Sequence, residues 1–236
     1  MMLAACGRLG MGGGNYQVIE YVGEVIERLS VSERLTLCNM SAELGAQTGI
    51  IAADQSTADY IRASGGDPGN WTAWRSDADA DFVAQHSFNA NELSPQVAAP
   101  HSPSNVKSVD ELAGRPIDQA YIGACTGAKL EDLHMAARIL VGQHVADGTR
   151  LLIAPASTRT TAAAAADGTL ATLTHAGAIL MPTGCGACAG YGAGVLAEGE
   201  ICIASTARNF KGRMGSSSSE VYLASPYTVA ASAVSG

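Results

Sequence analysis

Several features are scarce in this chain of 236 residues, and each scarcity excludes a class of protein. Lysine and arginine number 14 against 22 aspartates and glutamates, which gives a formal net charge of −8. This balance argues against a surface that binds nucleic acid or an anionic membrane. No run approaches the roughly 20 apolar residues that cross a bilayer, and the start lacks the basic and apolar regions of a signal peptide. We therefore expect a cytoplasmic protein without nucleic-acid or membrane partners.

Aromatic residues are also few, at 5% of the chain, whereas hydrophobic residues reach an ordinary 47%. Alanine, glycine and short aliphatic residues dominate instead. Such small side chains favour close packing of helices on a sheet over a bulky aromatic core. The length suits one large domain or two modest ones.

The first half of the chain predicts short helices and strands, and residues 16–22 could be either a short strand or the start of a helix. Residues 30–33 (SVSE) fit a capping box, so a helix is expected from there towards Gly45. Residues 49–53 are a short apolar strand candidate. Residues 56–59 (STAD) are expected to cap a second helix that ends near Gly65.

The second half predicts strands that alternate with helices. Helical segments are expected at residues 129–141 and 158–166. Alternation of this kind argues for a parallel sheet covered on both faces, whose ligand site lies beyond the carboxyl ends of the strands. Cys125, Cys185 and Ser205 all fall where a predicted strand ends. The predicted strands are AYIGAC (120–125), RLLIAP (150–155), AILMPT (178–183), ICIAS (201–205) and VYLAS (221–225).

The domain boundary is predicted from composition. Residues 64–80, with Gly, Pro, Asn and Asp, predict a surface loop. Residues 94–106 hold proline and serine without a helical period, and they predict an extended connection. We place the boundary after this connection, which gives α/β domains at residues 1–106 and 107–236.

Six cysteines carry the clearest chemical signal. Cys185 and Cys188 form a CxxC pair between glycines, which let the backbone approach a bulky ligand closely. The pair alone fits a redox motif, half a zinc site or part of an iron–sulfur cluster. No second CxxC exists to complete a zinc ribbon, but Cys125 is a plausible third thiolate. Three thiolates are one fewer than the four that saturate a [4Fe–4S] cluster, so one iron would stay open to substrate. Cys6, Cys38 and Cys202 are interpreted as ordinary buried cysteines.

Four segments together resemble the aconitase superfamily, specifically the C-terminal part of the large subunits of 3-isopropylmalate dehydratase and homoaconitase. They occur in the family's order and are similar to its motifs C-N-M-x-x-E-x-G-A, G-S-C-T, G-C-G-P-C-x-G and S-x-N-R-N-F-x-G-R. The resemblance implies two three-layer α/β/α domains with mainly parallel sheets. The segments are CNMSAELGA (38–46), GACT (123–126), TGCGACAG (183–190) and STARNFKGRMG (205–215).

The resemblance also implies a metal centre and a reaction. Cys125, Cys185 and Cys188 would ligate three irons of a [4Fe–4S] cluster, and the fourth iron would bind the substrate. The implied reaction isomerises a 2-hydroxy di- or tricarboxylate, such as 3-isopropylmalate, by removing water and adding it back. This places the chain in amino-acid biosynthesis of the leucine type.

Four further residues take roles by the same resemblance. Glu43 would act near the metal-bound hydroxyl, and Asn39 would position the substrate or cluster; their spacing of four puts them on one face of a helix. Arg208 and Arg213 suit a carboxylate-rich substrate, because guanidinium groups pair with carboxylates in bidentate fashion. In a chain so poor in cations, two arginines in one glycine-containing loop favour binding.

The chain also departs from the family pattern. Ala207 stands where asparagine is common before the first arginine, and Gly127-Ala128 replace Asn-Ser, which removes polar groups near the cluster. The family's N-terminal half, with its G-D-S-H segment, and the small swivelling subunit with its catalytic serine have no counterpart here. We therefore expect a truncated or split large subunit with little turnover alone. The alternative is a non-catalytic iron–sulfur or zinc-binding fragment with an assembly or regulatory role.

Overall fold

The computed structural model describes residues 1–236, which form two compact units. The large unit comprises Met1–Met11 and Ser94–Gly236, and the small unit comprises Gly12–Leu93. The division at Ser94 differs from the boundary predicted near residue 107. The physical reason is pairing: the stretch predicted as a bare connection contains a strand that joins the sheet of the large unit.

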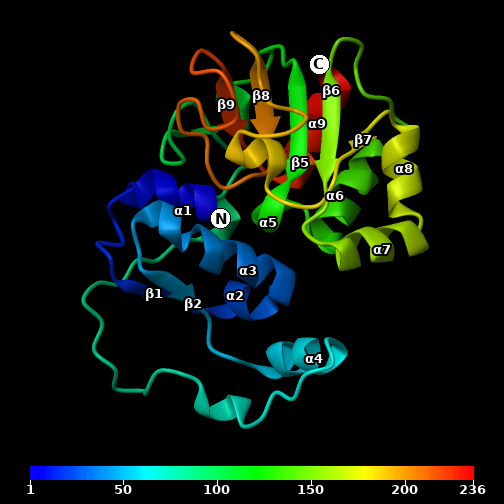
Figure 1. Cartoon of the computed structure of the whole chain (residues 1–236). Coiled ribbons are helices and arrows are strands. Elements are labelled where there is room, and N and C mark those ends of the chain that lie inside the picture. The colour runs from blue at the N-terminus through cyan, green and yellow to red at the C-terminus, as the bar shows by residue number, and fades with distance from the viewer. The chain divides into compact units, whose positions relative to one another are not determined.

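A seven-stranded sheet organises the large unit, in the order β4-β3-β9-β8-β5-β6-β7 (Figure 1). Strands β9, β8, β5, β6 and β7 are parallel to one another, whereas β3 is antiparallel to both β4 and β9. All five strands predicted for the second half are present. The bounds are β3 Gln96–Ala98, β4 Val106–Ser108, β5 Gln119–Gly123, β6 Arg150–Ala154, β7 Ile179–Leu180, β8 Ile201–Ala204 and β9 Glu220–Leu223.

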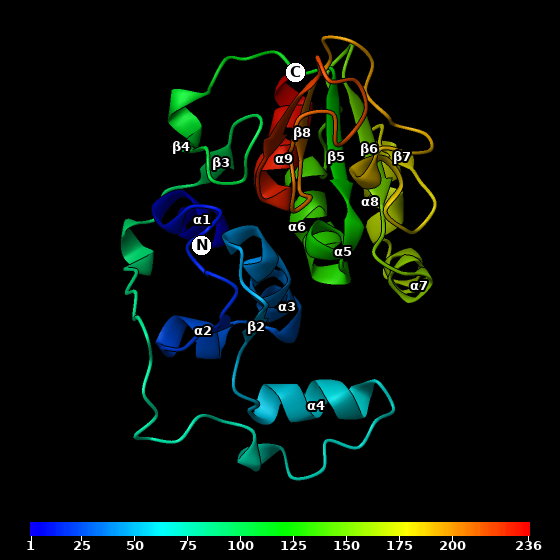
Figure 2. The ribbon, with the colours of Figure 1, turned by 60° about the vertical axis from the view of Figure 1, so that its left-hand side comes forward.

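Helices cover one face of this sheet. Ala120 and Ile122 of β5 point to that face and pack in one core cluster with Leu133, because alternate residues of a strand face opposite sides. Figure 2 shows α6 and α9 side by side against the strands. The two helices predicted between the strands are confirmed as α6 and α7. The bounds are α6 Leu130–Leu140, α7 Thr158–Ala166, α8 Thr169–His175 and α9 Pro226–Ser235, with the 3-10 turn η4 at Val109–Glu111.

The opposite face is covered differently. Tyr121 of β5 belongs to a second core cluster with Cys188, Leu196 and Met214, which come from irregular segments. The yellow-to-orange segment after β7 crosses this side of the sheet in Figure 1. Helix α1 (Met2–Leu9) packs on β3 and β4. The expected third layer is thus largely loop rather than helix, which leaves backbone close to the strand ends.

The small unit has a two-stranded parallel sheet of β1 and β2 rather than a full three-layer domain. The capping box at Ser30 is confirmed: its side chain accepts from the Glu33 N–H, and Glu33 accepts from the Ser30 N–H. The next helix begins earlier than predicted, because Asp54, not Ser56, is its N-cap. The bounds are β1 Val18–Glu20, α2 Glu24–Arg28, α3 Val31–Met40, η1 Ser41–Leu44, β2 Thr48–Ile50, α4 Gln55–Ala63, η2 Trp71–Ala73 and η3 Ala90–Glu92.

The expected class, α/β with mainly parallel sheets, is confirmed in both units. None of the helices has both the length and the apolar character that a membrane crossing requires.

Candidate functional site

Cys125 lies immediately beyond the carboxyl end of β5. The strand ends at Gly123, and the four-residue helix α5 (Ala124–Gly127) begins there. Ala124 has a φ of 66°, a left-handed conformation that residues with a side chain rarely adopt. Strain at such a residue persists only where the surrounding structure holds it. Cys125 is exposed at this sharp turn at the strand end.

Cys185 and Cys188 lie in the segment that follows β7. Gly184 and Gly186 have φ values of 131° and 46°, which explains the glycines on both sides of Cys185. The Cys188 N–H donates to the Cys185 carbonyl oxygen at 3.0 Å and closes the short 3-10 turn η5 (Gly186–Ala189). Cys185 is exposed, whereas Cys188 is only 7% exposed.

Burial and nearby charge act in opposite directions on the Cys188 thiol. Burial raises the pKa of Cys188, the Arg213 guanidinium lowers it, and charge on Cys185 and Cys125 raises it further. The hydrogen bond from the Tyr121 hydroxyl to the Cys185 carbonyl oxygen joins the CxxC segment to β5 independently of charge. The segment that follows β7 therefore lies against the strand that ends just before Cys125.

Tyr121 lies beneath this group of thiols and was not singled out from the sequence. Its hydroxyl donates to the Cys185 carbonyl oxygen at 3.4 Å. Burial raises the pKa of Tyr121 to about 12, and charge on Cys188 and Cys185 contributes in the same direction. The sequence feature that could have identified Tyr121 is its position two residues before the GAC sequence (123–125). In the structure this position is on the sheet face opposite the helices. Tyr121 therefore stays a neutral hydrogen-bond donor at neutral pH.

Of the two predicted arginines, Arg213 is joined directly to the cysteines. Its Nε donates to the Cys188 carbonyl oxygen at 3.0 Å, and the side chain also hydrogen-bonds the Cys188 thiol. Arg208 lies on the same loop between β8 and β9 and is half-buried. Between them, Asn209 is fully buried, and its Nδ2 donates to the carbonyl oxygens of Ala99 and Val221. Asn209 thus attaches the arginine loop to β9 and to the end of β3.

Asn39 and Glu43 lie in the small unit. Asn39 is exposed in the last turn of α3, whereas Glu43 is 2% exposed in η1. The α-helix ends at Met40, and a 3-10 turn follows. The prediction that Asn39 and Glu43 lie on one face of a helix requires a continuous α-helix. Because a 3-10 turn begins between them, the spacing of four residues no longer supports this prediction.

The geometry of the thiols bears on the kind of metal centre. No group of three or more His, Cys, Asp or Glu side chains is drawn together tightly enough to hold one metal ion. A single zinc ion would bring its thiolates to within about 4 Å of one another, since each Zn–S bond is about 2.3 Å. A cluster binds each thiolate through a different iron, which sets the sulfurs further apart. The thiols of Cys125, Cys185 and Cys188 are soft donors of the type that both zinc and iron–sulfur clusters bind.

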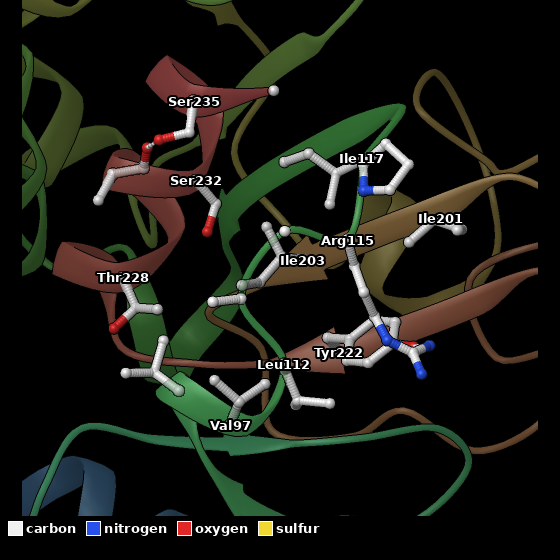
Figure 3. Close-up of a pocket in the computed structure, with 16 residues that line it drawn as sticks. Val97, Leu112, Arg115, Ile117, Ile201, Ile203, Tyr222, Thr228, Ser232 and Ser235 are labelled. Carbon is white, nitrogen blue, oxygen red and sulfur yellow. Dashed lines mark hydrogen bonds between the residues drawn. The ribbon is translucent and has the colours of Figure 1, made fainter.

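A cavity of the large unit lies away from these cysteines. Its volume is about 520 Å³, and Ile203, Tyr222 and α9 residues line it. Figure 3 shows Arg115 over the ring of Tyr222, and Arg115 Nη1 donates to the Tyr222 hydroxyl at 2.7 Å. Ile203 and Tyr222 belong to the core cluster on the helix side of the sheet, whereas Cys188 belongs to the other. None of the predicted site residues lines this cavity.

The fold and the site together define a mostly parallel α/β protein with three cysteines in the segments that follow β5 and β7. The sequence model of the aconitase family (aconitate hydratase) matches residues 1–116 and 107–236, which covers the whole chain. The chain belongs to the aconitase family.

Similar proteins include several large subunits. The 3-isopropylmalate dehydratase large subunit 1 of Methanopyrus kandleri is 46% identical over 236 residues, which is 100% of this chain and 56% of that protein. The probable methanogen homoaconitase large subunit of Methanosarcina mazei is 44% identical over the whole chain and 59% of its own length. The 3-isopropylmalate dehydratase large subunit of Moorella thermoacetica is 44% identical over 56% of its length. The chain thus spans little more than half the length of these relatives.

Proposed function

We propose that this chain is the C-terminal portion of the large subunit of a hydro-lyase that isomerises a 2-hydroxy di- or tricarboxylate similar to 3-isopropylmalate. The reaction would remove water and add it back, which moves the hydroxyl to the adjacent carbon. The observation that carries the proposal is the position of Cys125 directly after β5, while Tyr121 of the same strand donates to the Cys185 carbonyl oxygen and Arg213 donates to that of Cys188. The relatives named as 3-isopropylmalate dehydratases support the substrate class.

Cys125, Cys185 and Cys188 would hold a [4Fe–4S] cluster as thiolates. With three protein ligands, the cluster would supply a Lewis acid at its open iron, which stabilises departing hydroxide. Exposure of Cys125 and Cys185 suits a cluster that faces substrate. Arg213 beside Cys188 favours the thiolate form that a ligand must adopt.

Arg208 and Arg213 would bind the substrate's carboxylates. Arg213 Nε donates a hydrogen bond to the Cys188 carbonyl oxygen. The same side chain would therefore hold both a cluster ligand and a carboxylate of the substrate. Glu43 would transfer a proton at the departing hydroxyl, and Asn39 would orient the substrate. Burial of Glu43 at 2% exposure keeps its carboxyl group away from bulk water.

The proposed partners are the small swivelling subunit, which would supply the serine base, and the N-terminal part of the large subunit. The name "large subunit" of the relatives supports a second subunit. The chain spans 56% of the Methanopyrus protein, which supports the N-terminal part of a large subunit as the other proposed partner.

A complementation assay tests this function. The cluster-loaded chain is mixed with a dehydratase small subunit and with the N-terminal part of a related large subunit, and alkene formation from 3-isopropylmalate and homocitrate is followed by ultraviolet absorbance. We expect little turnover by the chain alone and clear turnover in the mixture. Arg208→Ala should lower kcat/KM by about 10- to 100-fold, because a hydrogen bond to a charged group contributes about 1.5–3 kcal/mol.

Arg138→Ala is the matched control. Arg138 lies on α6, which covers the sheet face opposite Cys188, and it donates to the Tyr227 hydroxyl. This substitution should leave turnover unchanged. A cluster-loaded mixture that dehydrates neither acid would contradict the proposed function.

A further inference from the structure

Ser205 bridges the two ends of the turn that bears Cys125. Ser205 is 6% exposed and directly follows β8. The Gly123 N–H donates to Ser205 Oγ at 3.2 Å, and Ser205 Oγ donates to the Gly127 carbonyl oxygen at 2.9 Å. One hydroxyl group therefore satisfies a donor before Cys125 and an acceptor after it.

The backbone of Ser205 adds two further ties. Its N–H donates to the Tyr121 carbonyl oxygen at 3.0 Å, and its carbonyl oxygen accepts from Thr126 Oγ1 at 3.3 Å. The packing leaves no space at this contact: a Cβ added to Gly127 would lie 2.1 Å from the Ser205 carbonyl oxygen. The turn of Cys125 is thus fixed against Ser205 over its whole length.

The turn needs such external support. Helix α5 has four residues, which is too short to be stable by its own hydrogen bonds. Ala124 adopts the left-handed conformation, and the exposed Cys125 follows it directly. Ser205 also begins the loop that carries Arg208 and Arg213, and so it joins that loop to the turn of Cys125.

We propose that Ser205 is a positioning residue that holds Cys125 in place as a cluster ligand. This inference rests on the proposed function, because the role has meaning only if Cys125 binds iron. Removing the hydroxyl would leave the buried Gly123 N–H and Gly127 carbonyl without that partner. The thiol of Cys125 would then sample more orientations, and its bond to iron would open more often.

The test compares Ser205→Ala with Ser219→Ala in the full chain. Ser219 is a matched control, because it is 2% exposed and its hydroxyl donates to the Ser216 carbonyl oxygen, away from α5. Cluster loss to an iron chelator is measured anaerobically, and alkylation of each cysteine in the cluster-free chain is followed by mass spectrometry. Circular dichroism and urea unfolding confirm that both variants fold.

Ser205→Ala should accelerate cluster loss by about tenfold, as expected for the loss of one buried hydrogen-bonding partner. It should also change the alkylation rate of Cys125 by several-fold while Cys185 reacts at its original rate, and Ser219→Ala should match the unmodified chain. An unchanged Cys125 rate, or an equal change at both cysteines, would overturn the inference. If the unmodified chain binds no cluster, the proposed function fails, but the alkylation rates still report whether Ser205 holds Cys125.

Discussion

Arg213 and Cys188 are the residue pair that links charge to metal binding. Burial raises the pKa of Cys188, and the guanidinium of Arg213 acts in the opposite direction. The thiolate, not the thiol, ligates metal and reacts with alkylating agents. The balance between burial and Arg213 therefore sets the pH at which Cys188 becomes available.

Arg213→Gln should raise the pKa of Cys188 further, because it removes the charge that opposes burial. The pH at which Cys188 alkylation reaches half its maximal rate should move upward, and cluster assembly should need a more alkaline buffer. Mass spectrometry of the alkylated chain across a pH series measures this.

Arg208→Gln is the matched control, because it removes one positive charge from the same loop and leaves the hydrogen bond from Arg213 to the Cys188 carbonyl oxygen in place. An identical pH profile for Arg213→Gln and the unmodified chain would show that the guanidinium does not act on the thiol.

Some features of single residues at the site could be predicted from the sequence, and others could not. The glycines around Cys185 predict a close backbone approach, and their positive φ values agree with that. The left-handed Ala124 has no sequence signal, because alanine rarely adopts this conformation. The bridging hydroxyl of Ser205 was equally hidden, since its partners lie 78 and 82 residues away along the chain.

At the scale of elements, an ion pair joins three helices of the small unit. Arg34 of α3 is 4% exposed, and its Nη2 donates to the Glu27 carbonyl oxygen of α2 at 2.7 Å and to Asp54 Oδ2 at 2.6 Å. Asp54 caps α4 by accepting from the Thr57 N–H. The hydrogen bond from Arg34 is the main reason that the pKa of Asp54 is lowered to about 2.

This pair predicts a pH dependence for α4. Since the folded-state pKa of Asp54 is lower than its unfolded value of about 3.9, the pair stabilises the fold fully above about pH 4. Its contribution is lost as the pH falls through about 2. The protection of the α4 amides, measured as exchange relative to the intrinsic rate at each pH, should fall between about pH 4 and 2, and Asp54→Asn should remove that part of the pH dependence.

Asp59→Asn is the control, because Asp59 is exposed on α4 and pairs only with neighbouring helix residues. If Asp54→Asn and the unmodified chain show the same pH dependence, the ion pair does not stabilise α4.

Local signals predicted the elements that depend on local sequence. The capping box at Ser30 and the helix at residues 158–166 are confirmed, as are the five apolar strands of the large unit. Strands β3 and β4 were missed, because each has three residues and gains its stability by pairing with distant parts of the chain. This missed pairing also explains why the units part at Ser94 rather than near residue 107.

At the scale of the whole molecule, the parallel sheet brings together cysteines that are 60 residues apart in the chain, at positions 125 and 185. The carboxyl ends of β5, β7 and β8 lie at one edge, as in other parallel α/β sheets. The order of these strands was not readable from the sequence, since the sequence does not show which strands become neighbours. The prediction that their ends converge needed only the parallel arrangement.

The central claim is that three thiolates hold one iron–sulfur cluster, and its most direct test is anaerobic reconstitution with iron and sulfide. We expect broad visible absorbance and about four irons and four sulfides per chain. Cys125→Ser, Cys185→Ser and Cys188→Ser should each lose most of this content. Cys202→Ala should keep it, because Cys202 is fully buried in the sheet and burial raises its pKa to about 12. Full cluster content in Cys125→Ser, or about one zinc and no iron in the unmodified chain, would contradict the account.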